Sequence, residues 1–156
     1  MRVRVVAAGT RLPGWLNEGF LEYARRMPRE TPLELKEIAV ARGESQGSAV
    51  RGKREEGERM LAALPAGAYV VALEVGGRAL DTEALARWWA ARLKDGRELA
   101  FLIGGPEGLS DACLARADER LSLSKLTLPH GLARVVLAEQ LYRVQSLLKG
   151  HPYHRA

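Results

Sequence analysis

The sequence predicts an α/β domain in which a mostly parallel sheet carries helices on both faces. Short apolar runs alternate with amphipathic segments along all 156 residues, as strands alternate with helices in this class. The apolar runs are rich in Val, Leu and Ile, which is expected of strands buried on both faces. No internal repeat is present, and a chain of this length fits one domain. We therefore expect residues 1–156 to fold as a single domain.

The elements of the first half follow in chain order. The first strand, Val3–Ala8, is an apolar run that glycine and proline soon interrupt, and Trp15–Arg26 then has a helical pattern. Leu33–Val40 is the second predicted strand. After it, the polar and glycine-containing stretch Arg42–Gly57 predicts a loop that runs into a charged helix at about Ala49–Leu64.

The second half repeats the alternation with clearer helix boundaries. Asp81 is a plausible N-cap for one helix, Gly96 a plausible end of it, and Ser110 a plausible N-cap for the next. The predicted strands are Tyr69–Val75, Glu98–Ile103 and Leu121–Leu123, and the predicted helices are Thr82–Lys94, Asp111–Ala117 and Leu132–Lys149.

The charge balance favours an anionic partner. The chain has 24 Lys and Arg against 19 Asp and Glu, a formal net charge of +5. Arginine dominates the positive charges, and its planar guanidinium suits bidentate contacts to phosphate. A GC-rich or thermophilic genome would give the same arginine excess, so the composition leaves both explanations open.

Several functional classes are disfavoured. The single cysteine, Cys113, lies in an apolar stretch and is predicted to be a buried thiol, since it can close no internal disulfide and start no CxxC site. His151 and His154 are three residues apart without a third ligand, which is a poor zinc site. No apolar run approaches the roughly 20 residues that span a bilayer. We therefore expect a cytoplasmic protein without a metal.

The segment Phe101–Ser110 is the most informative local feature. An apolar strand ends there in Gly104 and Gly105 and then leads into a helix. In an open α/β sheet, ligands bind outside the carboxyl ends of the strands, and glycines permit positive φ and close approach of a ligand. The spacing matches neither the dinucleotide fingerprint nor a P-loop. From the residues alone, a ligand-binding turn and a purely structural turn remain equally open.

Three further segments suggest binding. In Ser122–His130, leucines alternate with small hydroxyl residues, as in a pocket for an apolar ring, although an edge strand ending at Pro129 would look the same. The last helix, Leu132–Lys149, is apolar on more than one face and so predicts a second partner, such as another subunit. The tail from His151 carries groups that stack on bases and hold phosphate, although polar chain ends often fray.

Together these segments carry a specific resemblance. IGGPEGLS at 103–110, LSLSKLTLPH at 121–130 and LARVVLAEQLYRVQSLLKGHPYHR at 132–155 strongly resemble the RlmH (formerly YbeA) family of SPOUT-class methyltransferases. VVAAGT at 5–10 and REEGERML at 54–61 fit the same pattern, so the resemblance covers nearly the whole chain. It implies a homodimer that transfers a methyl group from S-adenosylmethionine (SAM) to N3 of a pseudouridine in 23S ribosomal RNA. The RNA substrate is either free or within the assembled ribosome.

The resemblance also implies a C-terminal trefoil knot, in which the last strand and helix thread a loop and hold the bent cofactor. General rules of topology would exclude a knot, because knotted chains are rare. The expectation of a knot therefore rests on the resemblance alone.

The site residues are carried over by position. The resemblance places in the cofactor pocket Leu73, Gly104, Gly105 and the loop residues Ser124, Lys125, Leu126, Thr127, Leu128 and Pro129. It places on the catalytic and RNA-facing side Glu139, Arg143, Tyr153, His154 and Arg155. The chain departs from the usual family residues at Gly131 and Val144, which affects local packing.

The expected chemistry needs alignment, proton removal and charge stabilisation. The methyl group of SAM is electrophilic and must be held in line with N3, an orientation effect of about 7–11 kcal/mol. N3 must also lose its proton, for which His154 is the first candidate base and Glu139 the second. Arg143 or Arg155 could instead stabilise the developing anion.

Two other classes fit less of the sequence. A nucleotide-dependent oxidoreductase would need the fingerprint glycines and room for a substrate domain, and this chain has neither. A non-catalytic RNA-binding or ribosome-assembly protein would use the basic surface but would not bind SAM.

Overall fold

The protein is an α/β domain built on one parallel sheet. The computed structural model describes the backbone of residues 1–40 and 46–155 and the side chains of residues 1–40 and 50–153. Within those residues the sheet has the order β2-β1-β4-β3-β5, with every pairing parallel. The strands are β1 (Val3–Ala8), β2 (Leu33–Ile38), β3 (Tyr69–Ala79), β4 (Leu99–Ile103) and β5 (Glu119–Ser122). The helices are α1 (Gly14–Ala24), α2 (Gln46–Ala62), α3 (Thr82–Asp95), α4 (Asp111–Arg116), α5 (His130–Leu148) and the short 3₁₀ helix η1 (Pro152–Arg155).

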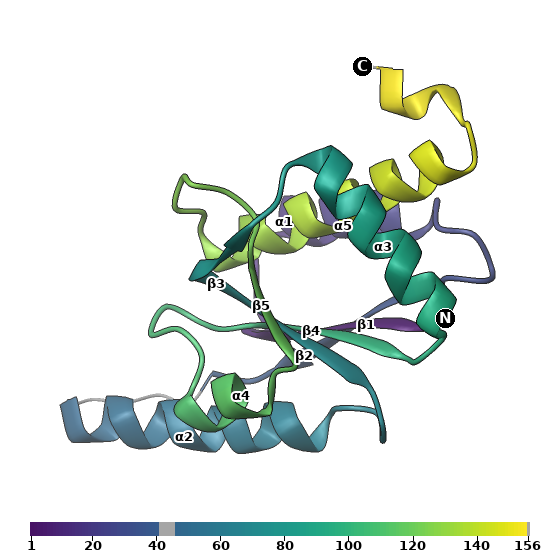
Figure 1. Cartoon of the computed structure of the whole chain (residues 1–156). Coiled ribbons are helices and arrows are strands. Elements are labelled where there is room, and N and C mark those ends of the chain that lie inside the picture. Colours follow the sequence, from purple (N-terminus) through teal and green to yellow (C-terminus); the bar gives the residue numbers. More distant parts are fainter. Residues whose placement is uncertain (41–45, 156) are drawn as a thin grey trace.

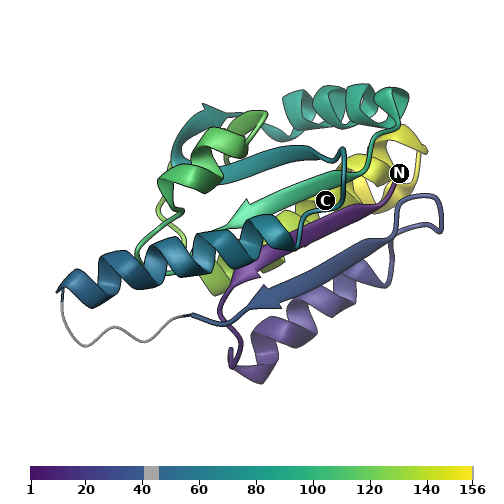
Figure 2. The same cartoon turned by 90° about the horizontal axis from the view of Figure 1, so that it is seen from below.

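Helices cover both faces of the sheet, as predicted. In Figure 1, α1, α3 and α5 lie on one face and α2 and α4 on the other; Figure 2 shows α2 crossing the sheet from below. Phe20, Trp89 and Leu137 belong to the core on the first face. Met60 and Cys113 belong to the core on the second. The central strands β1 and β4 are buried from both sides, which explains their continuous apolar sequences, whereas the edge strands β2 and β5 are partly exposed.

The predicted helix caps are confirmed. The side chain of Asp81 accepts a hydrogen bond from the Ala84 backbone N–H at 2.8 Å, and that of Ser110 accepts one from Cys113 at 3.2 Å. Gly96 ends α3 with φ of 76°, the left-handed conformation that glycine favours. Cys113 is buried, as expected from its apolar neighbours.

The predicted boundaries of two segments are wrong. The strand β2 ends at Ile38 and not at Val40. The helix α2 begins at Gln46, so the part of the expected loop from 46 to 57 is helical, while residues 42–45 lie outside the described residues. This helix packs closely on α4: a β-carbon on Gly57 would lie 2.2 Å from the Ser110 hydroxyl, so the glycine lets α2 and α4 approach.

The strand β3 is longer than predicted and has an irregular second half. Leu73 pairs with Leu121 of β5, and Arg78 pairs with Leu121 again, so the register shifts between the two positions. A β-carbon on Gly77 would lie 2.6 Å from the Leu121 carbonyl carbon, so only glycine fits there without a backbone shift. Such a bulge re-aims the side chains beside it. Here it carries residues 74–76 to the carboxyl edge of the sheet.

The last helix, α5, has its own sheet as one partner and α1 as another. Leu137, Leu141 and Val144 are fully buried in the core. On another face, Val135 packs against Gly19 of α1, where a β-carbon would lie 3.2 Å away. Gly131, one of the family departures, lies where Leu16 packs closely. The order of elements from β4 to α5 is consistent with a threaded end, and the knot stays a prediction.

A buried arginine ties α5 to the ends of two strands. The side chain of Arg134 is 2% exposed; its guanidinium pairs with Glu37 of β2 at 2.7 Å. It also donates to the carbonyl oxygens of Ala8, at 3.1 Å, and Gly9, at 2.8 Å. These contacts join residues 97 to 126 positions apart along the chain at the carboxyl edge of the sheet.

We expect Arg134→Met to lower the free energy of unfolding by about 3 kcal/mol, because breaking a buried ion pair leaves its partners unsatisfied. Removing one partner of a buried ion pair usually costs about 3–5 kcal/mol, and we expect the lower end because the Glu37 side chain is 33% exposed. Urea unfolding at one fixed protein concentration measures the effect. The matched control is Glu37→Gln, which keeps an acceptor for Arg134 and should cost about 1 kcal/mol. Equal stability of Arg134→Met and the parent would contradict the prediction.

Candidate active site

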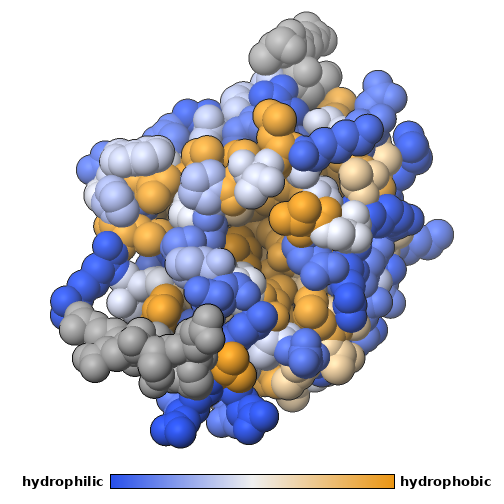
Figure 3. All heavy atoms as spheres, turned by 90° about the vertical axis from the view of Figure 1, so that its left-hand side faces the viewer, coloured by the Kyte–Doolittle hydropathy of each residue, from blue (hydrophilic) through white to orange (hydrophobic). Residues whose placement is uncertain are grey.

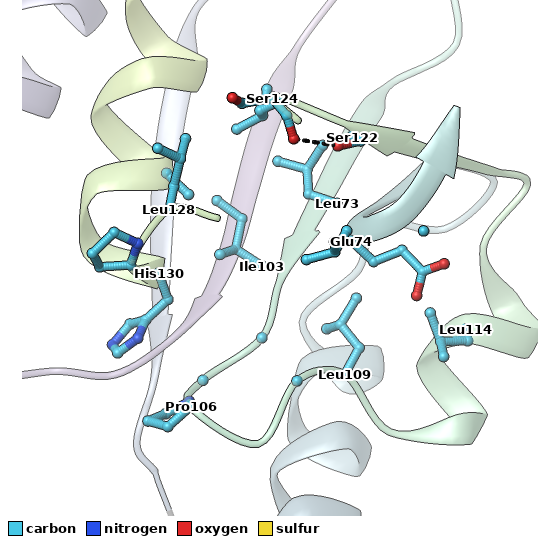
Figure 4. Close-up of a pocket in the computed structure, with 18 of the residues that line it drawn as sticks. Leu73, Glu74, Ile103, Pro106, Leu109, Leu114, Ser122, Ser124, Leu128 and His130 are labelled. Atoms are coloured by element: carbon cyan, nitrogen blue, oxygen red, sulfur yellow. Dashed lines mark hydrogen bonds between the residues drawn. The ribbon is translucent and has the colours of Figure 1, made fainter. Parts of the chain in front are cut away.

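A cavity of about 630 Å³ opens at the carboxyl ends of β3, β4 and β5. We call it the strand-end cavity. Figure 3 looks onto this side of the molecule and shows apolar surface gathered around a hollow between polar rims. The close-up in Figure 4 shows Leu73 and Ile103 on its wall, with Leu128 facing them from the loop before α5. Its position is the one at which open α/β sheets bind ligands, and its size suits a small molecule.

Most of the residues predicted to bind the cofactor lie on this wall. The structure brings together Leu73, Gly104, Gly105, Ser124, Leu126, Leu128 and Pro129. They come from β3, from the turn after β4 and from the loop after β5. Lys125 and Thr127, from the same loop, are exposed side chains that are not part of the wall. Their role in cofactor binding stays a prediction.

The reason for glycine at each position of the turn differs from the prediction. Neither Gly104 nor Gly105 has a positive φ; within this turn that conformation belongs to Gly108, at 79°. A β-carbon on Gly104 would lie 2.5 Å from the Gly108 carbonyl carbon, so the two backbone strands of the turn touch there. At Gly105 the nearest atoms would be 3.6 Å away, an ordinary contact. Close backbone packing therefore requires glycine at 104, and conformational freedom requires it at 108.

A buried carboxyl group supports the same turn from behind. Glu56 of α2 is buried, and its carboxyl group is hydrogen-bonded to the backbone of Gly105. Burial raises the pKa of Glu56, while the Gly105 hydrogen bond and the charges of Arg59 and Lys53 lower it. The motif at 54–61 thus contributes a contact that fixes the position of the turn.

The loop after β5 is shaped by its serines. The Ser122 hydroxyl donates to the Ser124 carbonyl oxygen at 2.9 Å, and the Ser124 hydroxyl accepts from the Leu126 backbone N–H at 2.9 Å. These local bonds fold residues 123–129 as a loop, which decides against the alternative of an edge strand reaching Pro129. Leu126 remains 76% exposed beside the cavity, an uncommon position for a large apolar side chain.

Sequence reasoning missed part of the wall. The bulged half of β3 adds Glu74, whose carboxylate has only a loose ion pair with Arg120 at 3.7 Å. The adjacent glycines at 76 and 77 were the available signal, since glycine inside a strand often marks a bulge. Lys53 of α2 and His130 of α5 also line the cavity. His130 ends the segment predicted to form a pocket but was not singled out, and no local pattern marked Lys53, because only the fold brings α2 to the sheet edge.

Three of the predicted catalytic residues form one cluster between α5 and η1. Glu139 accepts hydrogen bonds from Arg143, the shorter at 2.8 Å, and from the Tyr153 hydroxyl at 2.8 Å. We call Glu139, Arg143 and Tyr153 the C-terminal cluster. Burial and the hydrogen bond to Glu139 raise the pKa of Tyr153, so its phenol stays protonated. The Glu139 bond raises the pKa of Arg143 as well.

The tail is folded and not frayed. The ring of Tyr153 packs on Tyr142 of α5, with centroids 4.7 Å apart, and meets Tyr23 of α1 at 6.5 Å. The guanidinium of Arg143 lies 4.9 Å from the centre of the Tyr153 ring. The backbone of His154 and Arg155 continues in η1, while their side chains lie outside the described residues.

Within one chain, the C-terminal cluster and the strand-end cavity do not meet. His130 starts α5 at the cavity, and a helix rises 1.5 Å per residue, so Glu139 is about 14 Å and Arg143 about 20 Å farther along its axis. Figure 1 shows the tail at the end of α5 opposite the loops. The predicted cofactor-binding and catalytic residues therefore form two separate groups in a single subunit.

The described residues show neither a metal-binding cluster nor a membrane-spanning helix. No group of three or more His, Cys, Asp or Glu side chains in that part of the chain could hold a metal ion. Over the same residues, no helix combines the length and apolar character needed to cross a membrane.

Comparison with known proteins bears on these features. Residues 1–154 match the model of a family described as "Predicted SPOUT methyltransferase". The chain is 56% identical to the ribosomal RNA large subunit methyltransferase H of Alkalilimnicola ehrlichii, over 100% of both chains. It is 51% identical to the protein of the same name from Methylococcus capsulatus, over 99% of this chain and 100% of that one.

Two solved structures share the fold at low sequence identity. A probable methyltransferase from Bordetella pertussis superposes with a TM-score of 0.57 at 17% identity, over 92% of this chain and 95% of that one. A probable rRNA-methyltransferase from Porphyromonas gingivalis gives 0.52 at 15%, over 94% and 69%. The family model and the two relatives match nearly the whole chain, in agreement with the motifs around the strand-end cavity. This chain therefore belongs to the SPOUT methyltransferase family.

Proposed function

We propose that this methyltransferase transfers a methyl group from SAM to N3 of a pseudouridine in 23S ribosomal RNA, in the cytoplasm and as a homodimer. The observation that carries the proposal is the strand-end cavity, which the family's motifs line from three separate parts of the chain. Its support is the full-length similarity to proteins named ribosomal RNA large subunit methyltransferase H. The net charge of +5 suits an RNA partner.

The residues of the cavity fit SAM. Leu73, Ile103 and Leu128 form an apolar wall on which the adenine ring would lie. The turn at Gly104 and the loop at Ser124 bring backbone amide and carbonyl groups to the same space, where they can read the polar edge of the base. Glu74 offers the negative charge that would face the positively charged part of SAM. When bound, SAM supplies an electrophilic methyl group, and the chain's task is to orient it.

The separation of the two groups of residues supports the homodimer. If one chain cannot bring its C-terminal cluster to its own cavity, the active site is completed by a second chain. Trp15 of α1 is 64% exposed, and Leu132 and Val136 of α5 are only partly buried. Stable dimers of this kind usually bury more than about 2,000 Å² in total, largely apolar. A symmetric pairing through α1 and α5 would place each tail at the other subunit's cavity.

The tail then has a defined role in the shared site. Tyr153 is held by Glu139 and by the neighbouring tyrosines, so η1 is presented in one orientation. We assign to Tyr153, His154 and Arg155 the binding of the target nucleotide, in which an aromatic ring stacks on the base and a guanidinium holds phosphate. Arg143 or Arg155 would also stabilise the negative charge that develops on the base when N3 loses its proton.

Mass spectrometry of ribosomal RNA nucleosides tests the proposed function. We expect 3-methylpseudouridine in 23S RNA from cells with the gene, its loss on deletion, and its return when the gene is supplied again. Purified protein should add one methyl group from SAM to ribosomes of the deletion strain. Unchanged nucleosides after deletion, with SAM bound to the purified protein, would mean that the enzyme methylates a different substrate.

A further inference from the structure

His130 is the imidazole that the described part of the structure places on the wall of the strand-end cavity. It is the first residue of α5 and is half-buried. Figure 4 shows its side chain at the end of the cavity near Pro106, away from Glu74. His151, the other histidine with a described side chain, is exposed at the far end of α5. Among the described side chains of one subunit, His130 is therefore the imidazole within reach of the cavity's contents.

The surroundings of His130 hold its ring in place. Its Nε2 atom lies 3.6 Å from where a β-carbon on Gly9 would be, so the ring rests against the backbone at the end of β1. One helical turn later, Arg134 donates to the carbonyl oxygens of Ala8 and Gly9 and fixes that backbone to α5. The imidazole thus sits on a rigid helix, braced by a buried network, which is the support that a catalytic group needs.

The ring nitrogens of His130 are available. Among the described residues, only burial and the charge of Arg134 act on the His130 ring, and no hydrogen bond to it is found. Burial, and then the positive charge of Arg134, lower the pKa of His130 below its ordinary value. The other charged groups around it are Glu37, which is paired with Arg134, and Lys53 and Glu74 on the cavity wall. At neutral pH the ring is uncharged, and one nitrogen has a free electron pair.

The carboxylate of Glu139, another candidate base, already accepts several hydrogen bonds. Glu139 accepts hydrogen bonds from Arg143, Tyr153 and Gln140 in its own subunit. These hydrogen bonds use both carboxylate oxygens of Glu139 to hold Arg143 and Tyr153. Glu139 is therefore better suited to orient Arg143 and Tyr153 than to accept a proton.

We propose that His130 is the general base of the methyl transfer, accepting the N3 proton of the target base at the mouth of the strand-end cavity. This inference rests on the proposed function. The proton moves from N3 to the unprotonated ring nitrogen, and the N3 electron pair forms a bond to the methyl carbon. The bond between that carbon and sulfur breaks, its electron pair stays on sulfur, and S-adenosylhomocysteine is the product. The His130 imidazolium then releases the proton to water.

The test is a pH profile of single-turnover methylation, with SAM and ribosomes from the deletion strain as substrates. We expect the parent's rate to rise with pH along an acid limb and then level off, because the neutral ring is the active form. His130→Gln should lower the plateau roughly 10²- to 10⁴-fold and remove the acid limb. SAM affinity, measured by calorimetry, should stay within about threefold of the parent, since the lost group acts on the RNA base.

Comparison variants make the result decisive. His154→Gln carries the same change on the imidazole of the tail and should keep the acid limb. His130→Asn, with a smaller amide, repeats the test if the glutamine variant is misfolded by circular dichroism. An acid limb that persists without His130, or that disappears with His154→Gln, overturns the inference. A parent protein that binds SAM but leaves pseudouridine unmethylated refutes the proposed function, and this inference with it.

Discussion

Gly104→Ala should weaken SAM binding, although it adds only one methyl group. The new β-carbon would lie 2.5 Å from the Gly108 carbonyl carbon and 2.8 Å from the Leu109 nitrogen. Both neighbours are backbone atoms, so the turn has to open. Overpacking of this kind costs about 1–3 kcal/mol. The turn forms part of the cavity wall, so we expect this free-energy cost to weaken SAM binding. Calorimetry should show a loss of roughly 10- to 100-fold in SAM affinity.

The neighbouring glycine provides the matched control. In Gly105→Ala the β-carbon would meet Ala8, Glu56 and Val40 at 3.6 to 3.8 Å, which are ordinary contacts. We expect SAM affinity within about twofold of the parent, since surface and loosely packed positions tolerate such changes. Thermal unfolding of both variants separates loss of binding from loss of fold. If folded Gly104→Ala binds SAM as the parent does, the turn is not part of the cofactor site.

At a SAM concentration near the parent's Kd, two variants that each have little activity should restore activity when their chains are mixed. One variant carries Gly104→Ala and has a damaged cavity with an intact tail. The other is truncated after Pro152 and has an intact cavity without Tyr153. In a site shared between subunits, the mixed dimer contains one intact cavity facing one intact tail. Each mixed dimer should therefore have about half of the parent dimer's activity. In an equal mixture about half of the dimers are mixed, so the whole sample should have about a quarter of the parent's activity.

Native mass spectrometry establishes that mixed dimers have formed. The truncation is far from the cavity, because the tail lies at the other end of α5. SAM binding by the truncated protein should consequently be unchanged, which calorimetry checks. If mixed dimers are present and inactive, each site is built within a single subunit, and the proposed role of the partner's tail is wrong.

The sequence by itself determined the class of the fold and the general location of the site. Apolar runs report strands buried on both faces, and capping residues such as Asp81 and Ser110 act within one helical turn. These signals depend on neighbouring residues only, so they can be recognised in the sequence without knowledge of the fold. The local pattern at Gly104 and Ser124 left a ligand site and a purely structural role open, and the family resemblance assigned both to the cofactor pocket; both lie on the strand-end cavity.

The tertiary structure alone decided which residues share a site. Arg134 and Glu37 are 97 positions apart, and His130 meets the strand-end cavity only because α5 packs beside the sheet edge. Likewise, glycine is required at 104 because the backbone of Gly108 folds back on it, and not because of its own φ. Contacts between distant segments depend on how whole elements pack, and packing leaves no periodic trace in the sequence of either segment.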